Sequence, residues 1–404
     1  MAIQQSDSNS RILAVNAGSS SIKFALFSNG DTLERMAWGL LERIGLPKTT
    51  WVMQTSAGDQ QREPVSATTP AEACDELIGR LEQLLGKTVA TCIGHRVVHG
   101  GPRYTAPERV TPQLLAELRC LESFDPEHLP SELGLIETFA ARWPSVVQVA
   151  CFDTAFHAHL PRVARIMSVP RRLEALGVRR YGFHGLSYAY LIGELSRVAG
   201  PPAAGGRVIL AHLGNGASMA AVRDGQSIDT TMALTPTAGL PMSTRSGDLD
   251  PGLGWFLART QGMSPQGFFQ MVNRESGLLG VSETSSDMRD LQAARATDPR
   301  AAEAIDLFCY QASKTIGAYT AALGGLETLV FSGGIGENAA EVRAQICAGL
   351  ACLGIELDAA RNRGHAPVIS VNGGRVCVRV MHTDEEIMIA RSALRVISNA
   401  AANS

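Results

Sequence analysis

ILAVNAGSSSIKFALF (residues 12–27) decides the fold, because in it an apolar run gives way to a small polar loop and then resumes. Gly18 lets the backbone turn and approach a ligand closely, and the serines at 19–21 offer hydroxyl and amide donors. Lys23 supplies a positive charge for an oxyanion. Asn16, at the end of the first apolar run, can hold a metal-bound water without adding charge. The stretch predicts a phosphate-binding loop between two strands, with a polar hairpin turn as the alternative.

A second stretch, RVILAHLGNGASMAAVRDGQSIDT (residues 207–230), has the same architecture of strand, polar glycine loop, strand, Asp-Gly hairpin and strand. The first copy continues in the same way, with strands expected at 22–27 and 32–38 around the turn Asn29, Gly30 and Asp31. This is an internal repeat of one sheet unit. Two lobes that face a cleft, each opening on a phosphate-binding loop, are therefore expected, and the bare hairpin turn is disfavoured.

Composition limits the class of protein. The chain has 404 residues, 45% of them hydrophobic, and a net charge of only −3. At roughly 150 residues per domain, two or three domains are expected. No basic stripe favours nucleic acid, no apolar run reaches the roughly 18 residues that cross a bilayer, and residues 1–11 lack the features of a signal peptide. Eight cysteines are spread singly and are expected to be small core residues in a reducing compartment. A cytoplasmic protein without nucleic-acid or membrane partners is predicted.

The remaining pattern predicts alternating helices and strands, and hence a mixed sheet covered by helices in each lobe. In the first half, helices are expected at 70–85, 111–122 and 129–142, and strands at 90–94 and 146–152. In the second half, a loop is expected at 200–206, helices near 251–261, 264–275 and 299–323, and strands at 328–332 and 375–381. A capping box at 383–386 predicts a last helix at 384–398, which returns to the first lobe.

A third glycine cluster, SGGIGEN, follows the strand expected at 328–332. Glycines between a strand and a helix, here expected to begin near Asn338, let a ligand lie against backbone amides. The cluster predicts contacts to the ribose and α-phosphate of a nucleotide, or to its base.

Together these motifs resemble those of the acetate kinase family in order and spacing, over nearly the whole chain. The matching segments are VNAGSSSIKF, GHRVVHGG (94–101), FDTAFH (152–157), RRYGFHGLSY (179–188), AHLGNGAS (211–218), TRSGDLDPG (244–252), SSDMRD (285–290), SGGIGEN (332–338) and TDEE (383–386). The resemblance implies an α/β fold of two ribonuclease H-like domains around an ATP cleft, as in actin, sugar kinases and heat-shock ATPases. The domains would be 1–153 plus 387–404, and 154–386.

The resemblance implies reversible, in-line transfer of the γ-phosphoryl group of ATP to acetate, with Mg²⁺. The acid is already ionised at pH 7, so rate must come from positioning and charge. Arg96 would hold the carboxylate, since a guanidinium can grip two oxygens in one plane. Arg245 would stabilise the transition state, and His184 would hydrogen-bond the phosphoryl group. Asp153 matches a family position assigned to proton transfer, although orienting Arg96 or the metal shell is the physically preferred role.

By the same resemblance, Mg²⁺, or Mn²⁺ as an alternative, lies at Asn16 and Glu385, and the protein is a homodimer joined through the second lobe. Other histidines, namely His95, His99, His157 and His159, are expected to be structural. The residues expected to contact ATP or ADP are Lys23, His212, Leu213, Gly214, Asn215, Gly216, Asp287, Met288, Arg289, Gly334, Ile335, Gly336, Glu337 and Asn338.

The substrate pocket departs from the family pattern. Its apolar members match Val98, Phe183 and Pro236, but Glu127 occupies the position of a fourth. Propionate or butyrate therefore stays an alternative to acetate, because one methylene changes binding by only about 1–3 kcal/mol. A non-catalytic ATP-binding module of the actin or chaperone type would not explain the catalytic set, and a sugar kinase would need a polar pocket. Asp384 replaces a usual Asn, either to tighten the metal site or to cap the helix.

Overall fold

The computed structural model describes residues 11–18, 21–29, 32–45, 49–85 and 90–402. The predicted contributions of residues 19 and 20, and the turn at residues 30 and 31, lie outside this part of the chain. The chain divides into two compact units, Met1–Ala155 with Asp384–Ser404, and Phe156–Thr383.

The first unit contains a mixed sheet of eight strands in the order β5-β4-β3-β2-β1-β6-β8-β7. β1 pairs antiparallel with β2 and parallel with β6, and β6 pairs parallel with β8. β1 is central and wholly buried, as its run of apolar residues predicts. The strands are β1 (Arg11–Ala17), β2 (Ser21–Asn29), β3 (Leu33–Glu42), β4 (Thr50–Thr55), β5 (Gln60–Pro64), β6 (Cys92–Val97), β7 (Glu108–Arg109) and β8 (Val147–Phe152).

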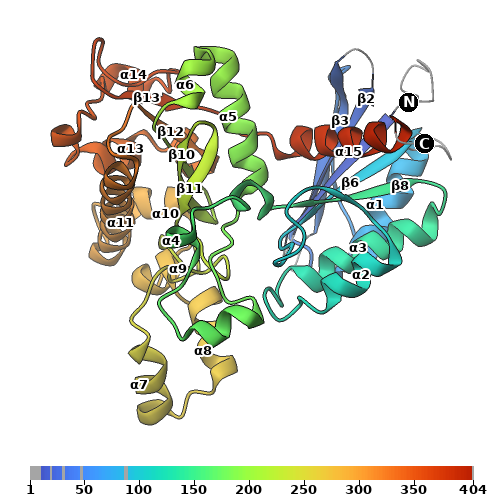
Figure 1. Cartoon of the computed structure of the whole chain (residues 1–404), viewed down its shortest axis with the longest axis horizontal. Coiled ribbons are helices and arrows are strands. Elements are labelled where there is room, and N and C mark those ends of the chain that lie inside the picture. The colour runs from blue at the N-terminus through green and yellow to red at the C-terminus, as the bar shows by residue number, and fades with distance from the viewer. Residues whose placement is uncertain (1–10, 19–20, 30–31, 46–48, 86–89, 403–404) are drawn as a thin grey trace. The chain divides into compact units, whose positions relative to one another are not determined.

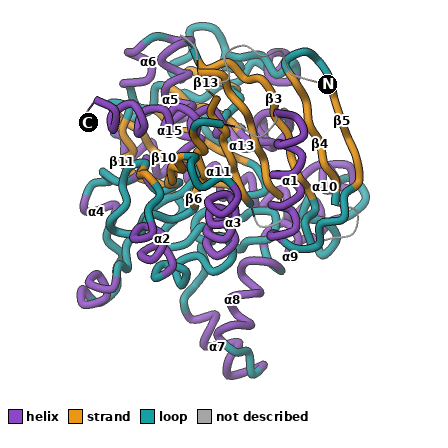
Figure 2. Tube along the Cα trace, turned by 90° about the vertical axis from the view of Figure 1, so that its right-hand side faces the viewer, coloured by secondary structure: helices purple, strands orange, loops and turns teal. Residues whose placement is uncertain are grey.

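Helices cover both faces of this sheet. They are α1 (Pro70–Leu85), α2 (Pro112–Arg119), α3 (Leu129–Arg142) and α15 (Glu385–Ala402). On one face, α1 and α3 pack in a core that includes Leu13, Phe24 and Ile93. Successive strand residues face opposite sides, so Gly94 faces α15, and a Cβ on Gly94 would lie 2.5 Å from Ile389. Figure 1 shows α15 running across the sheet, and Figure 2 shows β3, β4 and β5 side by side near α1. The predicted return of the last helix is confirmed.

The second unit repeats the central part of the first. Its five strands are β9 (Val208–Leu213), β10 (Ala217–Arg223), β11 (Gln226–Thr230), β12 (Thr328–Ser332) and β13 (Cys377–Val380), in the order β11-β10-β9-β12-β13. β11, β10 and β9 pair antiparallel, and β9, β12 and β13 pair parallel. The series β3-β2-β1-β6-β8 has the same directions in the same order. The structure therefore confirms the internal repeat.

Helices also cover both faces of the second sheet, with α5 and α11 on opposite sides of it in Figure 1. α5 contributes Tyr188, Leu191 and Leu195 to a core with Val208 and Leu210 of β9. The helices are α4 (Arg162–Arg165), α5 (Gly185–Ala199), α6 (Pro201–Gly205), α7 (Gly252–Gln261), α8 (Pro265–Arg274), α9 (Gly277–Ser282), α10 (Met288–Ala294), α11 (Pro299–Leu323), α12 (Gly333–Asn338), α13 (Ala340–Cys347) and α14 (Ala359–Arg363). Three short 3₁₀ turns are η1 (Ala155–His157), η2 (Arg171–Leu176) and η3 (Ala351–Leu353).

Several element predictions are corrected. The segment expected as a loop at 200–206 contains α6, because Pro201 and Pro202 occupy the first helical positions, where no amide donor is needed. The helix expected to begin near Asn338 is α13, which begins at Ala340, but the glycine motif before it forms the separate helix α12, which was not predicted. α2 ends at Arg119, short of the predicted 122, and β4 and β5 were not predicted.

The prediction that the cysteines are free core residues is confirmed only in part. All eight cysteines are free, but Cys120 and Cys352 are exposed and so are not core residues. No helix in the described parts of the chain combines the length and apolar character needed to span a membrane.

Candidate functional site

Polar side chains of the first unit gather where its parallel strands end. β1, β6 and β8 are adjacent, and Asn16, Arg96 and Asp153 lie at or just beyond their carboxyl ends. In α/β sheets ligands bind at this edge, because strand ends bring together side chains that are distant in sequence.

Arg96 is held by acceptors from three elements. Its Nε and Nη2 donate to a single oxygen of Asp153, Oδ2, at 3.1 and 2.7 Å. Its Nη1 donates to the carbonyl of Ala17 and to Oε1 of Glu132 on α3, both at 3.1 Å. Because a guanidinium has five N–H groups, these bonds leave one N–H, on Nη2, without an acceptor in the described chain. A two-point grip on a substrate carboxylate would therefore require one of these bonds to break.

Carboxylates outnumber cations around Arg96. Burial disfavours the charged guanidinium, but attraction from Asp153, Glu132 and Glu385 outweighs burial and raises the pKa of Arg96. Burial raises the pKa of Glu132 to about 7 against the opposing attraction of Arg96. Burial and repulsion from Asp153 raise the pKa of Glu385. An anionic ligand would need an additional cation here.

The residues predicted to bind Mg²⁺ are in direct contact. Nδ2 of Asn16 donates to Oε2 of Glu385 at 2.8 Å and to Oε1 of Glu386 at 3.2 Å. Oδ1 of Asp153 is buried and has no hydrogen-bond partner in the described chain. The described residues contain no group of three or more His, Cys, Asp or Glu side chains arranged to hold a metal. The donor set fits Mg²⁺, which binds through one or two carboxylates, water and substrate phosphates.

Lys23 lies on β2 opposite Asn16 in the strand register, and its side chain is exposed. It lines a cavity of about 220 Å³ together with Arg35, Trp38 and Glu386. The positive charge of Lys23 partly offsets the rise in the pKa of Glu385. The predicted phosphate-binding cation thus lies on the same side of β1 and β2 as the predicted metal ligands.

The residues predicted to line the substrate pocket belong partly to the first unit and partly to the second. Val98, directly after β6, is buried, and Glu127, in the segment before α3, is partly buried. The backbone N–H of Glu127 donates to Oδ1 of Asp125 at 3.2 Å. In the second unit Phe183 is buried and Pro236 is partly exposed.

His184 occupies a strained backbone position before α5. Its φ of 57° and ψ of 25° are left-handed, a conformation that non-glycine residues adopt at a cost and often at functional sites. Its Nδ1 lies 2.8 Å from Oγ of Ser218, which also bonds the hydroxyl of Tyr188. Its ring stacks on that of His212, with centroids 4.4 Å apart. These contacts fix the ring, so that its second nitrogen, Nε2, points away from Ser218.

That second nitrogen points at the glycine loop, as does Arg245. A Cβ on Gly216 would lie 3.3 Å from Nε2 of His184 and 3.6 Å from Nη1 of Arg245. Nη1 of Arg245 also donates to the carbonyl of Pro236 at 3.2 Å. The structure thus brings together His184, Arg245 and Gly216, to which the family resemblance assigns roles in phosphoryl transfer and ATP binding.

The two glycine loops of the second unit are neighbours. β9 and β12 run parallel, with His212 opposite Ser332 at their ends. Gly333 has a φ of 77°, and a Cβ on it would lie 2.7 Å from the carbonyl of Leu213, so only glycine fits. A Cβ on Gly214 would lie 3.8 Å from the backbone nitrogen of Gly334. The predicted phosphate loop (213–216) and the predicted adenosine loop (334–338) therefore form one surface.

Glu337 secures the second loop. Its Oε1 accepts from the N–H of Gly333 at 2.9 Å, and its Oε2 contacts Nδ1 of His382 at 2.9 Å. Burial alone would raise the pKa of Glu337, but the bond and charge of His382, the N–H of Gly333 and the charge of His212 together outweigh burial and lower that pKa. The side chain of Asn338 donates to the carbonyl of Gly334 at 2.9 Å. Both residues thus stabilise the helical turn that contains Ile335 and Gly336.

The segment 287–289 begins α10. Asp287 caps this helix by accepting from the N–H of Arg289, and its carboxylate also pairs with the Arg289 side chain. That pairing lowers the pKa of Asp287. The Arg289 side chain is 88% exposed, whereas Met288 is 3% exposed and belongs to the core. The side chain of Met288 is therefore not available to a nucleotide in this conformation.

Sequence reasoning missed three supporting residues, Glu132, Ser218 and Arg343. Glu132 could have been found, because it lies on the same helical face as Leu129, Leu133 and Ile136 and so points a carboxylate into the core. Arg343 is fully buried and donates to the carbonyls of Gly336 and Glu337 at 2.8 and 2.9 Å. An arginine within an ordinary amphipathic helix gives no such signal.

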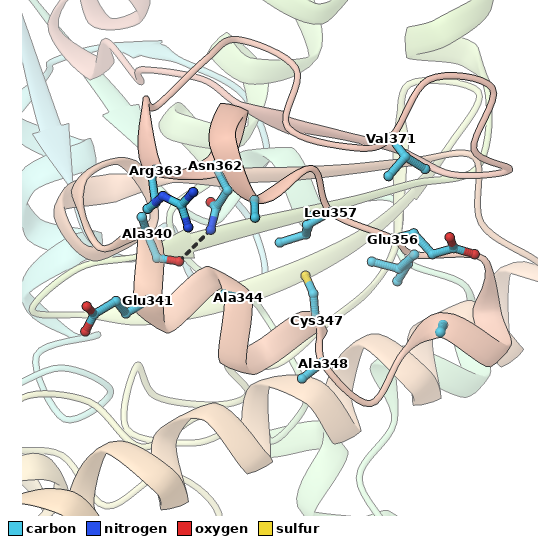
Figure 3. Close-up of a pocket in the computed structure, with 13 residues that line it drawn as sticks. Ala340, Glu341, Ala344, Cys347, Ala348, Glu356, Leu357, Asn362, Arg363 and Val371 are labelled. Carbon is cyan, nitrogen blue, oxygen red and sulfur yellow. Dashed lines mark hydrogen bonds between the residues drawn. The ribbon is translucent and has the colours of Figure 1, made fainter.

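A pocket of about 820 Å³ is lined by residues of α13 and of the segment 351–371 (Figure 3). Asn362 lines it and donates to the carbonyl of Ala340 at 2.7 Å, the bond drawn in Figure 3. Oδ1 of Asn362 accepts from Nε of Arg343 at 2.8 Å. None of the predicted site residues lines this pocket, but Asn362 in its wall is joined through Arg343 to the carbonyls of Gly336 and Glu337.

Comparison with known proteins identifies the family. The model of the Acetokinase family matches residues 11–391. A Rhodopseudomonas palustris (strain TIE-1) protein named acetate kinase is 44% identical over 392 residues, which cover 95% of this chain and 98% of that protein. A Citrobacter rodentium protein named propionate kinase is 43% identical over 395 residues, which cover 96% of each.

Solved structures agree with this relationship. The Porphyromonas gingivalis acetate kinase superposes with a TM-score of 0.86 at 34% identity, covering 96% of this chain and all (100%) of that one. A Francisella tularensis propionate kinase gives a TM-score of 0.89 at 34% identity with the same coverage. The chain therefore belongs to the acetokinase family, has its actin-like fold of two α/β domains, and is an ATP-dependent kinase with a carboxyl group as acceptor.

Proposed function

We propose that this kinase phosphorylates acetate, giving acetyl phosphate and ADP, and that it catalyses the reverse reaction as well. The observation that carries the proposal is the partly buried Arg96, which two carboxylates and a backbone carbonyl hold at the end of β6 with one N–H left for an anion. Val98, two residues along, is an apolar residue that is buried in this conformation, and a small alkyl group would reach it after a local rearrangement. A short-chain carboxylate combines those two features.

In the first unit, Asp153 acts by orienting Arg96. Both bonds from Arg96 converge on Oδ2 of Asp153, which suits a fixed anchor. A general base is not needed, since the acid is already ionised at pH 7. The other oxygen of Asp153, together with Asn16 and Glu385, suits the hydration shell of Mg²⁺. When bound, Mg²⁺ would offset the charge of the phosphates and of the surrounding carboxylates.

In the second unit, His184 and Arg245 act on the transferring phosphoryl group. The bond between His184 Nδ1 and Ser218 leaves Nε2 directed at Gly216, where a phosphoryl oxygen would be met. Arg245 approaches the same glycine and supplies positive charge to the transition state. Backbone amides of the 213–216 and 334–338 loops would bind the nucleotide, as glycine-rich turns do. In-line transfer draws its rate from such positioning rather than from covalent chemistry.

Propionate is the second candidate acid, because relatives of nearly equal identity are named acetate kinase and propionate kinase. Butyrate extends the same series. The partly buried Glu127 beside the acid-binding segment gives no reason to expect a long chain.

A homodimer in the cytoplasm is the assembly and location that we expect. The second unit exposes large apolar side chains, Trp255 at 71% and Phe256 at 57% on α7, which are typical of an interface between subunits. Free cysteines suit a reducing compartment. Light scattering that gave the mass of a single chain would contradict the dimer.

The test is a hydroxylamine trap for acyl phosphate, run with ATP and Mg²⁺ and with acetate, propionate or butyrate in parallel. We expect acyl hydroxamate with acetate at the highest kcat/KM. A preference for propionate or butyrate would correct the substrate. Absence of hydroxamate with all three acids would refute the proposal.

A further inference from the structure

Glu132 lies where a helix would normally place an apolar residue. It is 2% exposed and shares the buried face of α3 with Leu129, Leu133 and Ile136. A carboxylate in such a place is costly unless both oxygens are hydrogen-bonded. The partners that stabilise it should therefore explain why it is there.

Both oxygens of Glu132 bond to the acid-binding end of β6. Oε1 accepts from Nη1 of Arg96 at 3.1 Å, and Oε2 accepts from the backbone N–H of Val98 at 2.8 Å. One carboxylate thus fixes the guanidinium and the backbone of the apolar residue that follows it. No other side chain in the described part of the chain bonds to both Arg96 and Val98.

We propose that Glu132 is a positioning residue that sets the affinity for the acid substrate by fixing the direction of the free N–H of Arg96 relative to Val98. This rests on the proposed function, in which Arg96 meets the substrate carboxylate. Asp153 anchors Nε and Nη2 of the guanidinium, and the carbonyl of Ala17 shares Nη1 with Glu132. Of these acceptors, Glu132 alone also binds the backbone N–H of Val98, so it couples the direction of the guanidinium to the position of Val98.

The isosteric variant Glu132→Gln separates this role from mere space filling. Its amide has one acceptor oxygen, so it can accept from Arg96 or from Val98, while its NH₂ group faces the other donor. We expect the KM for acetate to rise at least about tenfold, a factor worth about 1.4 kcal/mol, with the KM for ATP within about twofold of wild type. Glu137→Gln, on the same helix but in an exposed pair with Arg119, is the matched control and should leave both KM values unchanged.

Titration gives a second readout. Glu132 has a pKa of about 7, raised by burial and lowered again by Arg96 and His128, while Asp125 adds repulsion. Glu385 and Asp153 face Arg96 from its other side. Protonation of Glu132 converts an acceptor into a donor, so the wild-type KM for acetate should rise as the pH falls from 8 to 6 at saturating ATP. Glu132→Gln should show the raised KM throughout, without this dependence.

The outcomes are distinct. An acetate KM for Glu132→Gln equal to or below the wild-type value would overturn the proposal, because a lower KM means that charge repulsion by Glu132 outweighs positioning. If Glu132→Gln does not fold, as judged by circular dichroism, Glu132→Asp replaces it. The shorter carboxylate reaches one partner only, and an unchanged KM for acetate would again overturn the proposal. Failure of wild type to form any acyl hydroxamate would instead refute the proposed function.

Discussion

At the scale of single residues, the burial of His95 on β6 makes the stability of this protein depend on pH. His95 is 1% exposed, and its Nε2 contacts Oε1 of Gln148 at 2.6 Å. Its Nδ1 is buried without a partner in the described chain. Burial lowers the pKa of His95 from 6.5 to about 4, although the bond to Gln148 partly offsets this effect.

The lowered pKa of His95 predicts loss of stability in acid. An unfolded histidine takes up a proton below about pH 6.5, whereas the folded one does so only near pH 4. The stabilisation is therefore complete above pH 6.5 and is lost as the pH falls towards 4, amounting to about 2 kcal/mol between pH 7 and pH 4.5. Urea unfolding at these two pH values should show that wild type loses about this much more than His95→Gln.

His159 provides the control for that measurement, since its side chain is exposed. His159→Gln should keep the wild-type dependence on pH. An equal loss of stability in wild type and His95→Gln would contradict the assignment to His95.

The residues that we propose to meet substrates were easier to predict than those that support them. Arg96, His184 and Arg245 lie in motifs that match the family, so the resemblance assigned them directly. Ser218 looks like an ordinary strand residue, and its bond to His184 depends on a fold that joins residues 34 positions apart. Hydrogen-bond partners of this kind follow from tertiary structure, which local patterns do not encode.

At the scale of elements, the N-terminus of α15 joins a helix cap to an ion pair. Oδ1 of Asp384 accepts from the N–H of Ile387 at 3.0 Å, so Asp384 caps the helix. The capping box had suggested Thr383 for this role. Both oxygens of Asp384 also accept from Nη2 of Arg35 at 2.6 Å. Thr383 instead contacts Oγ of Ser187 at 2.8 Å.

Substitutions of Asp384 should separate the cap from the ion pair. Asp384→Ala removes both and should lower the free energy of unfolding by about 1–2 kcal/mol. Asp384→Asn keeps a capping oxygen and loses only the partly exposed ion pair, so it should cost less than about 1 kcal/mol. Urea unfolding measures both values. Equal losses in the two variants would mean that the ion pair, and not the cap, carries the stabilisation.

Helices such as α1, α3 and α11 were predicted because their periodicity extends over many residues, although the 15-residue α5 was not predicted. β5 was not, since all of its residues are exposed and it pairs only at the sheet edge. α12 was missed because glycine has a poor helix propensity, which the bonds from Arg343 and Glu337 override here.

At the scale of the whole molecule, two units share one strand pattern, and we propose that they divide the work of one reaction. The repeat was predictable, because the same succession of strand, glycine loop and hairpin occurs twice in the sequence. The chemistry is not repeated. In the first copy, Asn16 at the end of β1, just before the loop, contacts carboxylates, whereas the loop of the second copy is approached by a histidine and an arginine.

This division predicts that acid and nucleotide binding can be separated by mutation. Arg96 belongs to the first unit, whereas the glycine loops belong to the second. Arg96→Ala should therefore lower acyl hydroxamate formation by at least about 10³-fold while the ADP affinity stays within about threefold. Arg96→Lys keeps a charge beside Asp153 and Glu132, and it serves if the alanine variant is unstable. Arg119→Ala, which removes an exposed arginine of the same unit, is the control.

The most direct test of the account is calorimetric titration of Arg96→Ala with ADP and Mg²⁺, alongside the hydroxylamine assay on the same preparation. The account predicts near-wild-type ADP binding by a protein that forms no detectable acyl phosphate. Loss of ADP binding together with activity in a folded Arg96→Ala protein, or retention of acyl phosphate formation, would contradict it.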